Sequence, residues 1–80
     1  MMEVRIQYYG MLAEISGQAL ELWTLGENTT VGALRDKLVE KYPEFGTKKF
    51  KVALNLQISD DHVTITPDSE IALLPPFAGG

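Results

Sequence analysis

The chain has 80 residues, of which 45% are hydrophobic and 22% charged, so it is a single globular domain and not a disordered or collagen-like chain. It contains no cysteine, which excludes disulfides, thiolate metal sites and a catalytic cysteine. Its net charge of −4 argues against nucleic acid as a partner and favours a basic protein surface, because opposite charges steer proteins together.

The pattern of residues 4–25 predicts two strands. Side chains at residues 4–9 alternate between apolar and polar, the period of a half-buried strand. Residues 10–17 form a connection, with a helical turn expected over 11–15. Residues 20–25 alternate again, and Trp23 lies on the face opposite the leucines of this strand. The sequence leaves open whether this tryptophan contacts a partner or is covered by loops.

The main helix is predicted directly after a turn at residues 26–28. Thr30 is a good N-cap residue, since its hydroxyl can accept from an N–H of the first turn. Pro43 ends the helix, because proline disfavours helical backbone in the residue before it. The apolar side chains recur at helical spacing and form one stripe, made of Val31, Leu34, Leu38 and Tyr42.

The second half of the chain predicts two more strands, at residues 52–57 and 71–74. A loop is expected at 44–51, a short apolar piece at Ile58 and alternation at 63–66. The strand at 71–74 is almost wholly apolar, as in a central strand buried on both faces. With one helix and too few strands for a barrel, we predict an α+β fold of the β-grasp type. Its mixed sheet has four to five strands, and the main helix packs on one face.

Several features are typical of ordinary surface and carry no predicted site. His62, the only histidine, follows two aspartates in a turn that we expect to be solvated, so we predict no metal site. The basic cluster of Lys48, Lys49 and Lys51 is typical of a solvated loop on an acidic chain. No apolar run approaches the ~20 residues that cross a bilayer. The first residues lack the basic and then apolar pattern of a secretory signal peptide. We therefore expect a cytoplasmic protein without membrane contact.

The C-terminal segment differs from the rest. Pro75 and Pro76 have no N–H, so the sheet must end there, and they favour an extended exit. The last six residues can reach roughly 18–20 Å from the domain. Gly79 and Gly80 have no Cβ, so this end can enter a narrow channel and present its carboxylate, with Phe77 as an anchor. A terminal Gly-Gly on its own is more typical of a frayed end.

The sequence resembles the small subunits of molybdopterin synthase, the MoaD-type sulfur carriers of the ubiquitin-like β-grasp superfamily. The resemblance covers nearly the whole chain and is strongest at residues 52–55 and 68–80. Its specific part is the ending Pro75-Pro76-Phe77-Ala78-Gly79-Gly80, which thiamine sulfur carriers usually lack. On this basis we divide the chain into a domain at 1–74 and a tail at 75–80. Ala13 departs from the family, which often has arginine there, and leaves one partner contact open.

The resemblance implies that Gly80 is the reactive residue. An ATP-dependent adenylyltransferase would consume ATP to activate the Gly80 carboxylate, and a sulfur donor protein would convert it to a thiocarboxylate. The large subunit of molybdopterin synthase would then pass the sulfur to cyclic pyranopterin monophosphate, a precursor of the molybdenum cofactor. The chain would be a subunit and co-substrate without a bound cofactor, in a heterotetramer with two copies of each subunit. The catalytic residues would lie on the large subunit.

The resemblance also implies a partner surface beside the start of the tail. Family members bind through an apolar patch, and the matching positions here are Tyr9, Ile58 and Leu74, with Phe77 beyond them. For Leu74 the alternative is a place in the core. Two other functions stay open: a thiamine-type sulfur carrier, and a ubiquitin-like modifier that is joined to lysines through Gly80.

Overall fold

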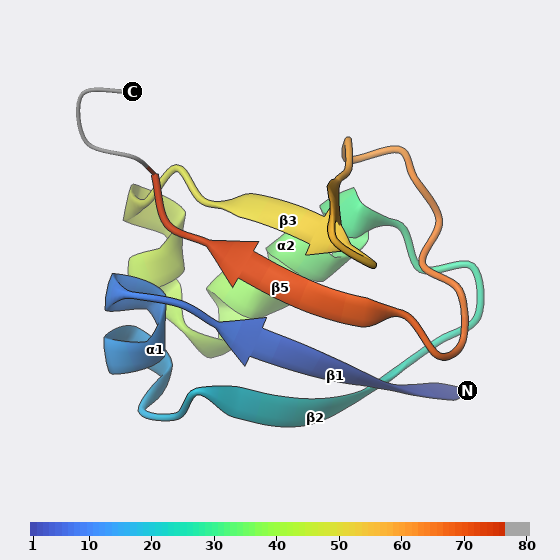
Figure 1. The fold of residues 1–80 in the computed structure, drawn as a ribbon, viewed down its shortest axis with the longest axis horizontal. Coiled ribbons are helices and arrows are strands. Elements are labelled where there is room, and N and C mark those ends of the chain that lie inside the picture. The colour runs from blue at the N-terminus through green and yellow to red at the C-terminus, as the bar shows by residue number, and fades with distance from the viewer. Residues whose placement is uncertain (77–80) are drawn as a thin grey trace.

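The protein is built on one mixed sheet of five strands in the order β2-β1-β5-β3-β4, as seen in a computed structural model that describes residues 1–76 (Figure 1). The strands β1 and β5 are parallel and lie at the centre, while all other neighbours are antiparallel. The elements follow the chain as β1 (Met2–Tyr8), α1 (Met11–Ser16), β2 (Leu20–Leu25), α2 (Val31–Lys41), the 3-10 helix η1 (Pro43–Thr47), β3 (Lys51–Leu54), β4 (Gln57–Ile58) and β5 (Glu70–Leu74).

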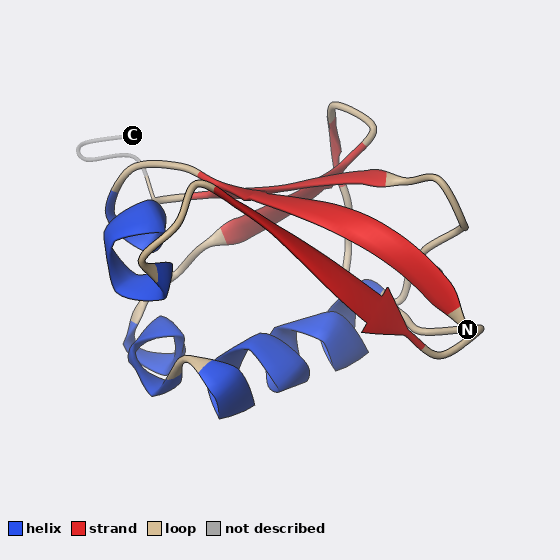
Figure 2. Cartoon of the chain, turned by 90° about the horizontal axis from the view of Figure 1, so that it is seen from below, coloured by secondary structure: helices blue, strands red, loops and turns tan. Residues whose placement is uncertain are grey.

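The main helix covers only one face of this sheet, as Figure 2 shows. In β1, buried and exposed side chains alternate along the whole strand, so one face meets the helix and the other stays open. Helix α2 begins after Thr30, whose hydroxyl accepts a hydrogen bond from the Ala33 N–H at 3.2 Å. These observations confirm the predicted β-grasp fold, the helix cap and the prediction of which side chains of the first strand are buried.

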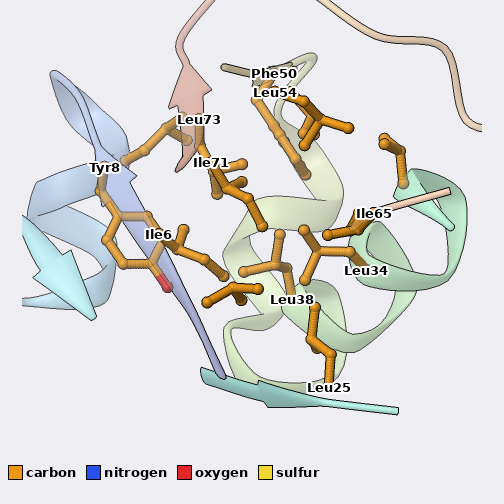
Figure 3. Packing of buried hydrophobic residues seen from close by; sticks show 14 of the residues in the cluster. Ile6, Tyr8, Leu25, Leu34, Leu38, Phe50, Leu54, Ile65, Ile71 and Leu73 are labelled. Atoms are coloured by element: carbon orange, nitrogen blue, oxygen red, sulfur yellow. The ribbon is translucent and has the colours of Figure 1, made fainter. Parts of the chain in front are cut away.

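The core lies between the sheet and α2 (Figure 3). Its side chains come from both central strands and from the apolar stripe of the helix, and they include Ile6, Leu34, Leu38, Ile71 and Leu73, all at most 1% exposed. An aromatic group of Tyr8, Tyr42 and Phe45 closes the end near α1, with ring centroids 5.3–6.1 Å apart. No helix within residues 1–76 is long and apolar enough to cross a membrane.

Two predicted elements differ from the structure. Within the expected loop at 44–51, η1 forms because Phe45 is drawn fully into the core. The strand expected at 52–57 ends at Leu54, since Asn55 and Leu56 both have positive φ and turn the chain back into β4.

One further expectation, on the last strand, is also wrong. The strand β5 is central but is buried on one face only, because no helix or strand within residues 1–76 covers the outer side of the sheet. Ala72 and Leu74 on that side are half-buried. The alternation expected at 63–66 is present: Ile65 enters the core, and Thr64 is exposed and makes an isolated bridge to Thr30.

Candidate functional site at the root of the tail

The tail leaves the domain from the centre of the sheet. After β5 ends at Leu74, Pro75 is half-buried and Pro76 is exposed. The parallel β1–β5 pairing continues one step past β1, where the Tyr9 N–H donates to the Leu73 carbonyl at 3.2 Å. The next residue, Gly10, has φ +57°, and a Cβ placed there would lie 3.2 Å from Pro75 Cγ. The turn after β1 therefore constrains the direction in which the tail starts.

The open face of the sheet surrounds this exit with apolar side chains. Residues that are paired in register share a face, so the strand pairings define rows across the sheet. In the row nearest the exit, Leu74 lies opposite Lys51. On the neighbouring β1, the Tyr9 hydroxyl donates to Gln7 Oε1 at 2.9 Å, which places this tyrosine on the same face. The next row crosses all five strands and consists of Leu20, Gln7, Ala72, Ala53 and Ile58.

The structure brings the predicted partner residues to this one face. Tyr9 is 47% exposed and Ile58 is 59% exposed, and Leu74 lies on the open side while its neighbour Leu73 is fully buried. The alternative that Leu74 belongs to the core is therefore excluded. Partner binding by these residues stays a prediction. The predicted tail residues Phe77, Ala78, Gly79 and Gly80 lie outside the described residues, and the boundary at residue 74 stays a prediction too.

Sequence reasoning missed two apolar residues of the same face. Leu20 and Leu22 on the edge strand β2 are 43% and 59% exposed, and both point away from the helix. The signal was present in the sequence, because both leucines alternate with residues of the covered face. Trp23 is one of those residues; it packs against the core, so it is covered rather than part of this surface.

A partly buried carboxylate ties the covered side of the sheet to the end of α2. Glu21 accepts hydrogen bonds from the hydroxyls of Tyr8 at 2.7 Å and Tyr42 at 2.9 Å, and it pairs with Lys41. Burial opposes its ionisation, but the hydrogen bonds from Lys41 and the tyrosines outweigh burial and lower the pKa of Glu21 to about 2. Burial and the Glu21 carboxylate raise the pKa of Tyr8 well above 10.0. This cluster holds a charge that stabilises the fold.

His62 is exposed, and within residues 1–76 no group of three or more histidine, aspartate or glutamate side chains is placed to hold a metal ion. A hollow of about 570 Å³ lies at the end of the sheet opposite the tail and is lined by residues such as Glu27, Thr64 and Asp68. This hollow is therefore not part of the surface around Leu74.

Comparison with known proteins decides the family. The model of the ThiS family matches residues 6–80, which is nearly the whole chain. The chain belongs to the ThiS family. Together with the sheet order and the single main helix, this match identifies the fold as the ubiquitin-like β-grasp of MoaD-type and ThiS-type sulfur carriers.

Solved structures of this family's fold superpose closely on the protein. A putative molybdopterin converting factor subunit 1 from Pyrococcus furiosus has a TM-score of 0.89 at 15% identity, covering 96% of this chain and 100% of that one. Small archaeal modifier protein 1 of Haloferax volcanii has a TM-score of 0.83 at 21% identity, with coverages of 96% and 100%. The complex of subunits 1 and 2 of the molybdopterin-converting factor from Helicobacter pylori has a TM-score of 0.69 at 26% identity, with coverages of 99% and 100%.

Proposed function

We propose that the protein is the sulfur carrier subunit of molybdopterin synthase. The observation that carries this proposal is the Pro75-Pro76 exit from the centre of the sheet, next to an open apolar face and ahead of a Gly79-Gly80 end. Membership of the ThiS family supports it, and so does the similarity to subunit 1 in the Helicobacter pylori complex. In this role the open face binds the large subunit, and Gly80 reaches into it.

The chemistry starts from an unreactive group. A C-terminal carboxylate has a pKa near 3.5, so at neutral pH it is ionised and a poor electrophile. In the proposed reaction its oxygen attacks the α-phosphorus of ATP on an activating enzyme, which forms an acyl-adenylate and releases pyrophosphate. Hydrosulfide can then displace AMP and leave a thiocarboxylate on Gly80 directly. A persulfide on a donor protein instead displaces AMP to form an acyl disulfide, and a second thiol of the donor cleaves its S–S bond, which releases the thiocarboxylate and leaves the donor as a disulfide. The chain has no cysteine, so its terminus is the only place where it can carry this sulfur.

Transfer completes the cycle on the large subunit. The thiocarboxylate sulfur attacks a carbon of cyclic pyranopterin monophosphate and displaces an oxygen substituent of that carbon. Hydrolysis of the resulting thioester leaves the sulfur on the pterin and restores the Gly80 carboxylate. A dithiolene contains two sulfur atoms, so two loaded chains are consumed per product. We propose an assembly with two copies of each subunit. This chain supplies the sulfur and the docking face, and the large subunit supplies the catalytic residues.

The test uses the last residue. The protein is incubated with its activating enzyme, ATP and a sulfur source, and intact-mass measurement should show one oxygen-for-sulfur exchange that fragmentation places on Gly80. Deleting Gly80 withdraws the carboxylate by roughly 3.3 Å and should abolish dithiolene formation. Thermal unfolding should not change, because the hydrophobic core of the described residues is built from side chains between Met2 and Leu73. Wild-type dithiolene formation by this deletion variant would refute the proposal.

A protein modifier is the second candidate, and the similarity to small archaeal modifier protein 1 favours it. In that case a lysine amine attacks the activated Gly80 carbonyl, which forms an isopeptide bond and releases AMP. Cellular proteins that carry the chain through Gly80 on lysine would support this function. The thiamine-type carrier, favoured by the family name, uses the same thiocarboxylate for thiazole formation. Sulfur transfer to a thiazole precursor and not to the pyranopterin would identify it.

A further inference from the structure

Charges on the open face are separated along the strands. Lys51 lies at the tail end of this face, in register with Leu74. The other end of β5 carries Glu70, which is exposed and pairs with Arg5 of β1. Leu74 lies four positions after Glu70, a distance of about 13 Å along a strand. The end of this face beside Leu74 therefore carries the cation Lys51, although the whole chain is acidic.

The basic segment is held firmly on the fold and is not a loose loop. Phe50, between Lys49 and Lys51, is only 5% exposed. Arg35 of α2 stacks on this ring, with Cζ 4.6 Å from its centroid, and donates to the Phe50 carbonyl at 2.8 Å. The same arginine is fixed by Asp61, since its Nε lies 2.8 Å from Oδ1. The two exposed lysines on either side of Phe50 thus have a backbone anchored by the core and by the helix.

These lysines are not neutralised within the described part of the chain. The ion pairs within residues 1–76 join the N-terminus to Glu27, Arg35 to Asp61 and Lys41 to Glu21. None of them includes Lys49 or Lys51. Two unpaired cations next to an apolar face form the kind of charged rim that orients a partner without occupying the centre of the interface.

We propose that Lys49 and Lys51, which we call the basic rim, bind an acidic surface on the activating enzyme beside the channel that receives the tail. This inference rests on the proposed activation of Gly80. For this contact we therefore expect an acidic partner surface, the opposite of the basic surface expected from the net charge of −4. Charges act over about 10 Å at 0.1 M salt, so the rim beside the exit matters more for docking there than the distant carboxylates.

The test compares charge reversals at two places. Lys51→Glu changes the rim, and Lys37→Glu makes the same change of net charge on the exposed side of α2, where Lys37 has no ion pair with residues 1–76. Association of each variant with the purified activating enzyme is measured by stopped-flow fluorescence at 25 mM and 300 mM salt. We expect Lys51→Glu to lower the association rate constant about tenfold at low salt, and much less at high salt. Lys37→Glu should stay within about twofold of wild type.

Lys49→Glu provides a second rim variant outside the strand, in case Lys51→Glu disturbs β3. Circular dichroism identifies any variant that does not fold. Equal rates for rim and helix variants, or a loss that does not depend on salt, would overturn the inference. Adenylation of Gly80 without dithiolene formation would instead refute the proposed molybdopterin role and leave the basic rim in place. A wild-type chain that the enzyme neither binds nor adenylates would refute both.

Discussion

Substituting Gly10 by alanine should have two effects that can be measured separately. It should lower the stability of the domain, and it should change the direction in which the tail starts. Gly10 has φ +57° and ψ −134°, a backbone conformation that only glycine adopts without strain. A side chain there costs roughly 1–3 kcal/mol of folding free energy. Its Cβ would also lie 3.2 Å from Pro75 Cγ, so the start of the tail must shift by a few tenths of an ångström.

Gly17, at the other end of α1, offers a matched control. It has φ +79°, so alanine there costs roughly 1–2 kcal/mol, but a Cβ would meet no atom within 4 Å. Both variants should therefore lower the free energy of unfolding by similar amounts. Only Gly10→Ala should misdirect the tail. Because a misplacement of ~1 Å can cost about a hundredfold in rate, we expect the smaller shift to slow sulfur transfer by about three- to tenfold.

The assay has two readouts. Urea unfolding gives the stability of each variant, and dithiolene formation is measured with the large subunit at a temperature where both variants are fully folded. Gly17→Ala should work at the wild-type rate. If the two variants lose the same amount of activity, or if Gly10→Ala loses none, then the contact between Gly10 and Pro75 does not direct the tail.

Three further predictions follow from the packing. Leu74→Glu should leave the thermal transition in place and weaken binding to the large subunit by more than tenfold in a titration, whereas Leu73→Glu, in the core, should abolish the transition. The Glu21 carboxylate has a pKa of about 2 when folded and 4.5 ordinarily, so its contribution of about 3 kcal/mol is present above pH 4.5 and lost towards pH 2. Urea titrations should show that Glu21→Gln lacks this part of the acid transition. Arg35→Ala should lower the unfolding free energy by about 1–2 kcal/mol, since it leaves the Phe50 carbonyl without its donor, and an unchanged urea midpoint would contradict that.

Local patterns predicted those elements whose side chains repeat with a regular period. The alternation in β1 and β2 and the apolar stripe of α2 identified three elements and their buried faces. The break after Leu54 gave no such signal, because Asn55 and Leu56 adopt positive φ although neither is glycine. They form the two-residue turn between β3 and β4, and β5 holds this turn in place. The Asn55 N–H donates to the Glu70 carbonyl at 2.8 Å, and the Asn55 Oδ1 accepts from the Glu70 N–H at 3.0 Å.

Only part of the site could be predicted from the pattern of the strands. The alternation in β1 places Gln7 on the exposed face, whereas the almost wholly apolar β5 gave no sign of an exposed face, and Tyr9, Ile58 and Leu74 came from the resemblance. Contacts between residues far apart in the chain were not predictable. The hydrogen bond from Arg35 to Phe50 spans 15 residues, and neither residue shows a distinctive pattern. The Glu21 cluster joins β1, β2 and the end of α2 in the same way.

The parallel pairing of β1 with β5 has a consequence for the timing of folding. Because Ile6 of β1 pairs with Ile71 of β5, the N-terminal strand can pair at the centre of the sheet only after the last strand has been synthesised. This pairing joins residues that are separated by nearly the whole chain. Such long-range contacts are slow to form, because a long loop must close before they contribute any stability. The residues that follow β5 are therefore presented beside a completed surface only when every other element is in place. A partner that needs both the surface and the tail thereby selects chains that have finished folding.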